Sequence, residues 1–520
     1  MAWSSEFIDW VSGGRREGGV WILEVVVSNT EPQATDGYRI ASVEGYGDVV
    51  AIAAVGPTIS GPRLSPVTWS SSIGTIRVPL VGDMAAITQQ LTRGTICRLL
   101  LGQVGWSVAS QFETVAWGQV ISLRGSGGRY DLELQDPLRA ISQRLSNTAP
   151  ELFSGNGATT TLTGAHSELA TTITVNSTSG FIMDNNGYVI GLIQIGSELI
   201  TYTGKTATTF TLPSTDNRGA FGTTKAAYAG GETVTELAIL AGHPLDIARR
   251  VILSHPEAGN SEWDDYDSSW GLAVRQSLVD IDDIENFKQK VVLSTMRWDV
   301  AVAGTVDDAG AWLASLLAKG GMFLTTRQGL LTVRGAQLPN TISTPPVSEI
   351  EIVEADIVDG WGGILCEAWA TEQPTEYAGV STQSATGTTT YSETTLATLP
   401  GASAAVLYDC SDVIWFSEAG NRQDISDRLA IMACRVPEAI QLTCAGMRLA
   451  QLTPGDVVYL RSERVGIRFS YTGGTSGRRG MVTQVSPDWA RNEVKLRILF
   501  YPTYTTAFEP DAVSWFDTGV

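Results

Sequence analysis

Short segments rich in Val and Ile, separated by polar and glycine-rich turns, characterise residues 1–154 and predict a β-rich unit. Apolar residues at helical spacing predict two helices, at 82–91, where Asp83 is the N-cap, and at 136–145. The sequence RGSGG at 124–128 predicts a hairpin turn. The predicted strands are 20–27, 49–55, 95–101, 113–123 and 130–134.

Residues 155–236 change character, being rich in Thr and Gly and lacking the pattern of a helix. Segments of alternating polar and apolar residues, bounded by Gly, Ser or Asn, predict a small inserted all-β module. Its last turn is TDNRGAFGTTKAAYAGG at 215–231, in which Asn217, Arg218 and Gly219 turn the chain towards a final strand near Thr233. The alternating segments are 171–177, 188–196, 197–204 and 208–214.

Residues 237–347 predict a mixed α/β middle domain. One helix is predicted at 243–254, with Pro244 in its first turn, and a second at 307–319, capped by Asp307 and ended by glycines. Two strands around a turn at 327–329 predict a β-hairpin. The apolar face of the second helix consists of Trp312, Leu313, Leu316 and Leu317.

Residues 348–520 again predict strands, then a helix at 421–433, then strands. The Ser/Thr-rich segment 381–395 is predicted to be an exposed, mobile loop, and the tail 501–520 is expected to dock on another subunit. The shared order of elements indicates that 1–154 and 348–520 are two copies of one tube-like β-barrel unit. The predicted fold class is mainly β with α+β parts. The predicted strands are 349–357, 363–370, 439–445, 456–461, 480–485 and 493–500.

Composition limits the possible functions. A chain of 520 residues is too long for a single core, and a charged fraction of only 17% suggests that other subunits cover part of its surface. A net charge of -20 disfavours a nucleic-acid-binding surface. The same charge is compatible with a conduit through which DNA slides without binding, or simply with a solubilising surface.

No targeting signal is expected, because the start lacks a basic segment followed by an apolar one. No membrane span is expected either, because the sequence contains no run of about 18 apolar residues. Five cysteines, an odd number without close spacing, argue against a disulfide scaffold and favour synthesis in a reducing cytoplasm. The gaps between Cys366, Cys410, Cys434 and Cys444 include no CxxC, so these residues are interpreted as buried free thiols rather than cluster ligands.

No constellation of catalytic residues stands out. His166, His243 and His255 lack metal-ligand spacing and are interpreted as surface or capping residues. The acidic loop EWDDYDSSW resembles a calcium loop only in part, since it lacks the glycine and the distant glutamate of an EF-hand, and a solvated acidic loop is the alternative. Its carboxylates are Asp264, Asp265 and Asp267. We therefore predict no catalytic, cofactor-binding or metal-binding residue, and no enzyme.

Three passages resemble the tail-tip hub proteins of tailed bacteriophages. The segment 80–141 resembles their first barrel, 307–335 resembles the helix and hairpin of their middle domain, and 452–498 resembles their last barrel through a PGD turn and a V-x-x-V-S-x-D pattern. The module at 155–236 resembles modules inserted in phage structural proteins, which makes its last turn a decoration hairpin. The first-barrel pattern consists of Gly118, Val120, Ser122, Tyr130, Leu132, Leu134, Asp136 and Leu138.

The resemblance implies a homotrimeric ring at the tail tip or baseplate, in which two barrels per chain match the six-fold tail tube. It implies contacts with a distal tail or tail tube protein, the end of the tape-measure protein, and tip or fibre proteins, with phage DNA passing through the lumen without specific binding. It implies a location in the virion after synthesis in the host cytoplasm. The sequence departs from those relatives that carry a closely spaced four-cysteine iron–sulfur cluster or an appended peptidase or lysozyme domain.

Two other classes stay open. A tail-associated cell-wall or polysaccharide hydrolase would need an acid/base or nucleophile constellation, and no such pattern is found. A receptor- or carbohydrate-binding tail protein would show fibre-like repeats or several tryptophans on one module. The 15 tryptophans are scattered along the chain, and the inserted module has none.

Overall fold

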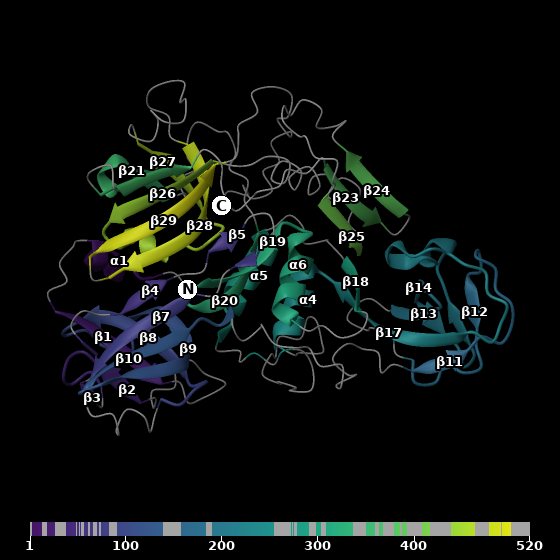
Figure 1. The fold of residues 1–520 in the computed structure, drawn as a ribbon, viewed down its shortest axis with the longest axis horizontal. Helices are drawn as coiled ribbons and strands as arrows, with labels where there is room; N and C mark the ends of the chain where they lie inside the picture. Colours follow the sequence, from purple (N-terminus) through teal and green to yellow (C-terminus); the bar gives the residue numbers. More distant parts are fainter. Residues whose placement is uncertain are drawn as a thin grey trace.

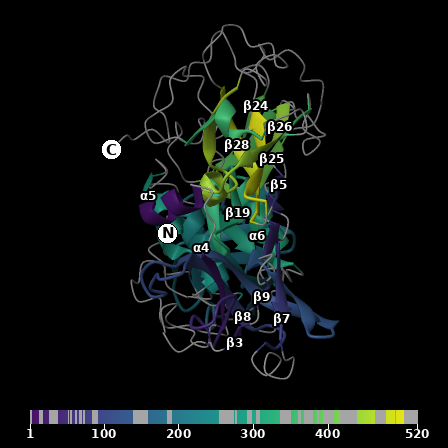
Figure 2. The same ribbon diagram turned by 90° about the vertical axis from the view of Figure 1, so that its left-hand side faces the viewer.

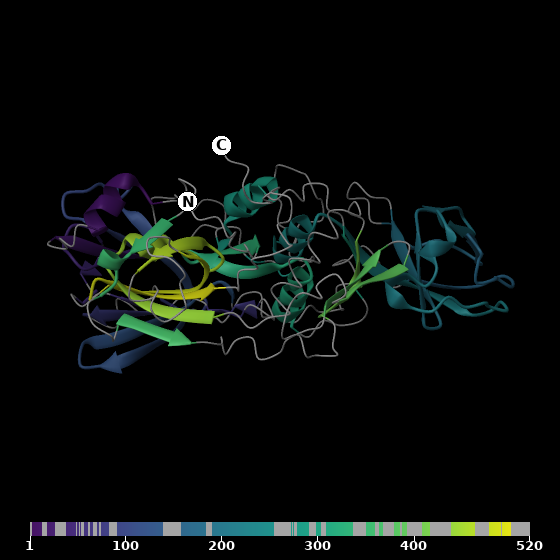
Figure 3. The ribbon, with the colours of Figure 1, turned by 90° about the horizontal axis from the view of Figure 1, so that it is seen from above.

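The computed structural model is mainly β, with several sheets and a few short helices, which confirms the predicted fold class. Figures 1 and 3 show two sheets at one end, helices and a hairpin in the middle, and the small β module at the other end. No helix in the described part of the chain is long and apolar enough to span a membrane. The described residues are 3–12, 18–25, 38–47, 49–50, 52–53, 57–60, 63–65, 70–71, 74–82, 91–138, 158–181, 183, 190–253, 272, 274, 278–290, 298–302, 308–335, 350–358, 363–367, 379–384, 387–392, 408–415, 438–462, 478–489 and 491–500.

The first sheet has the strand order β3-β2-β1-β8-β9-β10-β7-β4 and confirms the strands predicted in 1–154. The segment predicted at 49–55 is confirmed only in part, as β3 and an isolated bridge at Ile52. Most of the two helices predicted in this unit, residues 83–90 and 139–145, lies outside the described residues. The strands are β1 (Gly19–Val25), β2 (Arg39–Ala41), β3 (Val49–Val50), β4 (Thr58–Ser60), β7 (Thr75–Val81), β8 (Ile96–Gln103), β9 (Glu113–Ser126) and β10 (Arg129–Gln135).

The predicted glycine-rich hairpin turn is confirmed between β9 and β10. Gly127 and Gly128 have φ angles of 63° and 79°, the left-handed conformation that a two-residue type I′ turn requires at both positions. Glycine adopts it without a Cβ clash, so the sequence GG fixes the register of this hairpin.

The second sheet has the order β21-β27-β28-β29-β26-β22 and confirms the strands predicted in 348–520. The predicted helix at 421–433 and the tail at 501–520 lie outside the described residues. The strands are β21 (Ile350–Val353), β22 (Ile364–Glu367), β26 (Glu438–Ala445), β27 (Val457–Arg461), β28 (Arg478–Asp488) and β29 (Glu493–Phe500).

The two sheets repeat one topology. In the first, the successive strands β7 to β10 lie in the order β8-β9-β10-β7; in the second, β26 to β29 lie in the order β27-β28-β29-β26. These neighbours are antiparallel in both sheets. The next strand on each side is β1 or β4 in the first sheet and β21 or β22 in the second, and the first sheet continues beyond β1 with β2 and β3. The two sheets differ in that β21 is parallel to its neighbour whereas β1 is antiparallel.

The central hairpins of the two sheets match in register as well. Counted from its turn, each hairpin has five successive residue pairs, and then one residue of the longer strand is left without an opposite partner in the register. This bulged residue is Ile121 in β9 and Thr483 in β28. Such a bulge bends a strand and increases its twist. The order of predicted elements indicates two copies of one unit, and the structure shows the same strand order and the same bulge position in both sheets. Buried residues at equivalent positions are Val120 and Val482, Leu132 and Leu496, and Leu134 and Ile498.

The two sheets lie one above the other at the left of Figure 1 and share one apolar core. Leu99 and Leu132 of the first sheet and Ile440 and Ile498 of the second belong to this core. Helix α1 (Ser5–Ser12) adds the fully buried Phe7. Burying an apolar side chain contributes about 1.5–3 kcal/mol, so this common core holds the two sheets together.

The inserted module forms the strands predicted for it around its own apolar core, which includes Ile173, Ile193, Tyr202, Phe210 and Val234. However, the last strand, β17, extends beyond the predicted end at 236. Its first part pairs with β11 and β13 of the module and its second part with β18 of the middle region. The module is therefore joined to the rest by a continuous strand. Its strands are β11 (Thr159–Thr161), β12 (Thr172–Thr174), β13 (Gly191–Ile195), β14 (Glu198–Tyr202), β15 (Gly204–Lys205), β16 (Thr209–Thr211) and β17 (Thr233–Gly242).

The stretch 215–231 is not the predicted decoration hairpin. It begins with two short 3-10 turns, η2 (Thr215–Asn217) and η3 (Ala220–Gly222). Between them Arg218 has a fully buried side chain. Because this arginine points inward to a carboxylate, the segment folds onto the module and does not extend from it.

The middle region confirms both predicted helices and the hairpin. In α6, Leu313, Leu316 and Leu317 are buried as predicted and Trp312 packs against the same core. The N-cap is Asp308, whose carboxylate accepts from the Ala311 backbone N–H at 2.9 Å, and not Asp307, which lies outside the described residues. The elements are α4 (Pro244–Leu253), α5 (Ile281–Lys290), β18 (Trp298–Val302), α6 (Ala309–Ala318), β19 (Met322–Arg327) and β20 (Leu330–Gly335).

The prediction of an exposed, mobile Ser/Thr-rich loop at 381–395 is wrong over most of that range. Strands β23 (Gly379–Ser384) and β24 (Gly387–Ser392) form an antiparallel pair there, and β23 also pairs with β25 (Tyr408–Trp415). Threonine is β-branched and favours extended backbone, and ladder hydrogen bonds do not need an apolar face. A search for alternating apolar residues therefore misses these strands.

Candidate functional site

The tip of the β19–β20 hairpin presses on the first sheet. Gln328 and Gly329 form its turn with φ angles of 50° and 82°. A Cβ on Gly329 would lie 2.1 Å from the backbone nitrogen of Trp117 in β9. Only glycine allows this approach, so the sequence RQGL positions the middle region against the first sheet.

The base of the same hairpin contacts the second sheet. Phe323 of β19 is fully buried in a small cluster with Leu64, Met481 and Leu499. Gly455, in the PGD turn before β27, has a φ of 99°, and a Cβ there would lie 2.6 Å from Cζ of Phe323. The hairpin therefore lies between the two repeated sheets and contacts both.

Charged groups reinforce this junction. Asp283 of α5 accepts hydrogen bonds from Arg327 at 2.6 Å, from Thr332 at 2.8 Å and from two nitrogens of Arg334 at 2.8 Å each. Nη1 of Arg334 also lies 3.4 Å from the carboxylate of Asp456 in the PGD turn. Burial raises the pKa of Asp456, and the charge of Arg334 opposes that rise. The arginine thus links the middle region to the second sheet.

A cavity of about 70 Å³ lies where the three parts meet. Aromatic rings from separate parts of the chain gather beside it: the ring centroids of Trp3 and Trp489 are 6.2 Å apart, and those of Trp21 and Trp489 are 5.3 Å apart. The lining includes Trp3, Trp117, Asp136, Gln328, Leu452 and Trp489. Its walls combine apolar and polar side chains, so packing and polar contacts both contribute to the junction.

Asp136 is the ionisable side chain of this cavity. Its carboxylate accepts the backbone N–H groups of Gly74 at 2.5 Å and Leu138 at 3.0 Å, which joins the end of β10 to the start of β7. Burial raises the pKa of Asp136 to about 7, and the two backbone hydrogen bonds limit the rise. Asp136 therefore acts as a structural cap for the backbone N–H groups of Gly74 and Leu138.

The raised pKa of Asp136 predicts a stability that depends on pH. Its ordinary pKa is 3.8, so between that value and about 7 the folded chain binds the proton and the unfolded chain does not. This contribution is present below pH 3.8 and is lost as the pH rises to 7, with a slope of at most about 1.4 kcal/mol per pH unit. Asp136→Asn should flatten the slope that calorimetry measures between pH 4 and 7.

Asp131→Asn is the matched control, because Asp131 is exposed on β10, the strand that directly precedes Asp136. We expect it to keep the pH dependence of the unmodified chain. An Asp136→Asn variant with an unchanged slope would contradict the assignment of the proton to Asp136.

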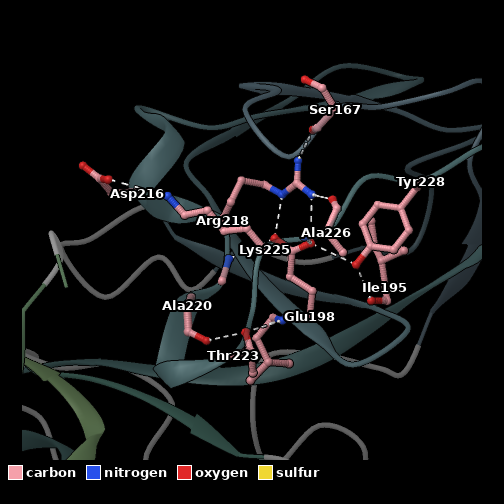
Figure 4. Close-up of polar contacts among 12 residues, drawn as sticks. Ser167, Ile195, Glu198, Asp216, Arg218, Ala220, Thr223, Lys225, Ala226 and Tyr228 are labelled. Atoms are coloured by element: carbon pink, nitrogen blue, oxygen red, sulfur yellow. Dashed lines mark hydrogen bonds and ion pairs between the residues drawn. The ribbon is translucent and has the colours of Figure 1, made fainter. Parts of the chain in front are cut away.

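The inserted module has a buried polar network of its own (Figure 4). Arg218 and Glu198 form two parallel hydrogen bonds, of 2.7 Å and 2.8 Å, and both side chains are fully buried. The hydroxyl of Tyr228 donates to Glu198 at 2.9 Å, and Arg218 donates to the backbone oxygens of Ser167 and Ala226. Burial raises the pKa of Glu198, but hydrogen bonds from Arg218 and Tyr228 outweigh it, and the pKa lies below 4.5.

The histidines and acidic residues considered from the sequence do not come together. Nδ1 of His243 accepts the Leu245 backbone N–H at 3.2 Å at the start of α4, which is the capping role predicted for a histidine. Nε2 of His166 in the module accepts the Thr174 backbone N–H at 3.2 Å. His255 and the acidic loop with Asp264, Asp265 and Asp267 lie outside the described residues.

The cysteines are described in part. Cys444 is a buried free thiol, as predicted, and Cys97, for which no such prediction was made, is buried and free as well. Burial raises the pKa of each to about 12. Cys366 is a half-buried free thiol, whereas Cys434 lies outside the described residues and Cys410 is placed only by its backbone in β25. Within the described ranges, no group of three or more His, Cys, Asp or Glu residues could hold a metal ion.

Sequence reasoning missed the residues that build the junction and the network. Asp283, Arg327 and Arg334 lie in three different elements, so no local motif joins them. In the sequence Arg218 follows Asn and precedes Gly, a pattern that predicts a turn and does not indicate a buried ion pair. One signal for a buried partner is present in the sequence. Glu198 begins the predicted strand SELITY and is followed by the apolar residues Leu199 and Ile200, so a charged residue stands in a segment that is expected to be buried.

No protein-family model matches the sequence, and no curated protein matches it. Among solved structures, the chain is similar to the tail protein from Neisseria meningitidis MC58, with 11% identity and a TM-score of 0.39 over 93% of this chain and 96% of that one. It is similar to the 43 kDa tail protein of prophage MuSo2 from Shewanella oneidensis, with 9% identity and a TM-score of 0.38 over 92% and 98%. It is also similar to a chain of the virion of a native gene transfer agent particle, with 12% identity and a TM-score of 0.17 over 42% and 78%.

Proposed function

We propose that this chain is a structural hub of a bacteriophage tail tip or baseplate. The observation that carries the proposal is the internal repeat: two sheets of one strand order, with bulges at equivalent positions, packed on a common core. The motifs that resemble tail-tip hub proteins fall on this repeat. The pattern from Gly118 to Asp136 lies on β9, β10 and the residue that follows, and the V-x-x-V-S-x-D pattern lies on β28.

Two equivalent sheets per chain suit an adaptor between symmetries. Three copies would present six equivalent sheets, the number that matches a six-fold tail tube, and contacts between unlike surfaces of successive copies close into a ring when the rotation permits. A chain with a net charge of -20 would give the lumen an acidic or neutral wall, past which DNA slides by repulsion. The partners in this proposal are a distal tail or tube protein, the tape-measure end, and tip or fibre proteins.

The test of this location is labelling of assembled particles. An antibody against the inserted module, conjugated to gold, should mark the tail tip if the chain is a hub, and the module is a suitable target because it lies at one end of the molecule (Figure 3). Label along the tail shaft or on the head would contradict the proposal.

The hub proposal also predicts no hydrolytic activity. Asp136 is held between two backbone N–H groups, and Glu198 is fully paired with Arg218, so neither carboxylate is available as an acid or base. We expect purified full-length chain to leave peptidoglycan, capsular polysaccharide and casein uncleaved. Cleavage that disappears on a single substitution would favour the hydrolase alternative.

A further inference from the structure

The two repeated hairpins present equivalent outward rows of side chains at their tips. We call Val81, Arg129 and Ser126 the first tip row; they lie side by side on β7, β10 and β9. The second tip row consists of Ala445, Glu493 and Asp488, which lie side by side on β26, β29 and β28. Each row is the first regular set of pairs next to its turn, so the two rows occupy the same place in the repeat.

The first tip row is open to solvent. Val81 is 44% exposed, an unusual value for a valine in a sheet that packs on a core, and Arg129 and Ser126 beside it are exposed. Figure 2 shows the far end of this hairpin projecting at the lower right, away from the rest of the first sheet. In the second tip row Ala445 is exposed and Glu493 is half-buried.

The two rows are similar at one edge and opposite in charge, since the first carries Arg129 and the second carries Glu493 and Asp488. Each has a small apolar side chain at one edge, Val81 or Ala445, next to a charged residue at the centre. That residue is Arg129 in the first row and Glu493 in the second. The reversal continues at the next outward position, where Asp131 of β10 is equivalent to Lys495 of β29.

This reversal favours contact between unlike rows. A chain with a net charge of -20 repels its own copies, so a surface through which copies associate needs local compensation. Two first rows would place arginines together and two second rows would place carboxylates together, whereas a first row against a second row pairs Arg129 with Glu493. Such complementarity selects one contact and disfavours the two alternatives.

We propose that the first tip row of one copy of this chain binds the second tip row of the next copy. The proposal rests on the assembly of several copies proposed above and identifies one of its contacts. Because the two rows are unlike, the contact is heterologous, and its repetition gives a closed ring or an open array. Val81 and Ala445 supply the apolar part, and Arg129 and Glu493 determine which row meets which.

Charge reversal on the full chain tests this contact by sedimentation velocity. Arg129→Glu and Glu493→Arg should each raise the dissociation constant between copies about tenfold, because an attraction becomes a repulsion. The double variant restores opposite signs and should return to within about threefold of the unmodified chain. Matched controls are Arg93→Glu and Glu168→Arg, since both residues are exposed outside the tip rows; they should leave association unchanged.

The outcomes separate this contact from the assembly itself. If the unmodified chain associates and the single reversals have no effect, or the double variant is no better than the singles, this contact is wrong and the assembly stands. If the unmodified chain stays monomeric at every concentration, both proposals fail.

A pair of introduced cysteines provides a second measurement, which is informative even if the charge-reversal variants do not fold. One batch carries Val81→Cys and another carries Ala445→Cys, and both are full-length. Under mild oxidation the mixture should yield a disulfide-linked dimer that neither batch gives alone. Equal cross-linking in the single batches and the mixture would overturn the pairing of unlike rows.

Discussion

Replacing Arg218 with alanine should lower the stability of the inserted module by about 3–5 kcal/mol, the usual effect of removing one partner of a buried ion pair. The reason is the carboxylate left behind. Glu198 is fully buried, and without the two hydrogen bonds from Arg218 it keeps only Tyr228 and the backbone N–H groups of Gly219 and Ala226. The backbone oxygens of Ser167 and Ala226 lose donors as well.

Hydrogen exchange on the full chain measures this effect where it occurs. Peptides from 190–234 should lose protection in Arg218→Ala, while those from β9 and β28 should keep theirs. Lys225→Ala is the matched control, because its ion pair with Asp216 is 3.8 Å long and both side chains are exposed (Figure 4). Such pairs contribute less than about 1 kcal/mol. Equal effects of the two substitutions would contradict the role assigned to the buried pair.

The pH dependence of the same variant has a predicted sign. The folded pKa of Glu198 lies below its ordinary 4.5, so the unmodified module keeps this contribution above pH 4.5 and loses it as the pH falls through the folded value. Without Arg218, burial is left with less opposition and raises the pKa of Glu198. The stability difference between the variant and the unmodified chain should therefore shrink on acidification.

Replacing Gly329 with alanine should separate the middle hairpin from the first sheet, at a cost of about 2–5 kcal/mol. Left-handed backbone costs a residue with a Cβ about 1–2 kcal/mol, and forcing extra atoms into a packed contact costs about 1–3 kcal/mol more. The new Cβ would stand 2.1 Å from a backbone nitrogen, which cannot move as the end of a flexible side chain does. The whole hairpin must therefore shift, because no change of side-chain rotamer relieves a clash with the backbone.

Gly127→Ala is the matched control for this substitution. Gly127 also has a positive φ, 63°, but nothing lies within 4 Å of its Cβ position. The control should show the backbone strain alone, so the excess loss in Gly329→Ala reports the contact with Trp117. We expect lower calorimetric midpoints for Gly329→Ala and faster hydrogen exchange in β9, β19 and β20. Identical midpoints for the two variants would show that the hairpin does not depend on this approach.

Much of the fold could be predicted from the sequence, because strands that bury one face carry a visible pattern. Segments such as GLIQI and LLTVRG were identified by apolar residues between turn residues, and the glycines of RGSGG and RQGL fixed two hairpin turns. Strands β23 and β24 were missed, because Thr and Ser gave no apolar face to detect. The cap of α6 was placed one residue early, because Asp307 and Asp308 are adjacent and equally suited.

The repeat was visible in the order of elements but not in the residues, and the reason is physical. The shared core requires only that inward positions be apolar, which Leu134 and Ile498 satisfy with different residues. Outward positions are free to diverge, and Arg129 and Glu493 differ even in sign. The junction could not be predicted at all, since Asp283, Arg334 and Asp456 meet only after α5, β20 and the PGD turn of the second sheet have packed together.

The most direct test of the account is a cryo-microscopy map of assembled tails that contain this chain. We predict a ring of three copies at the tail tip, in which the first and second sheets alternate around the axis and give six similar positions facing the tube. The lumen should be lined by acidic or neutral side chains. A single copy away from the axis, or a lumen lined with lysine and arginine, would contradict the proposed hub.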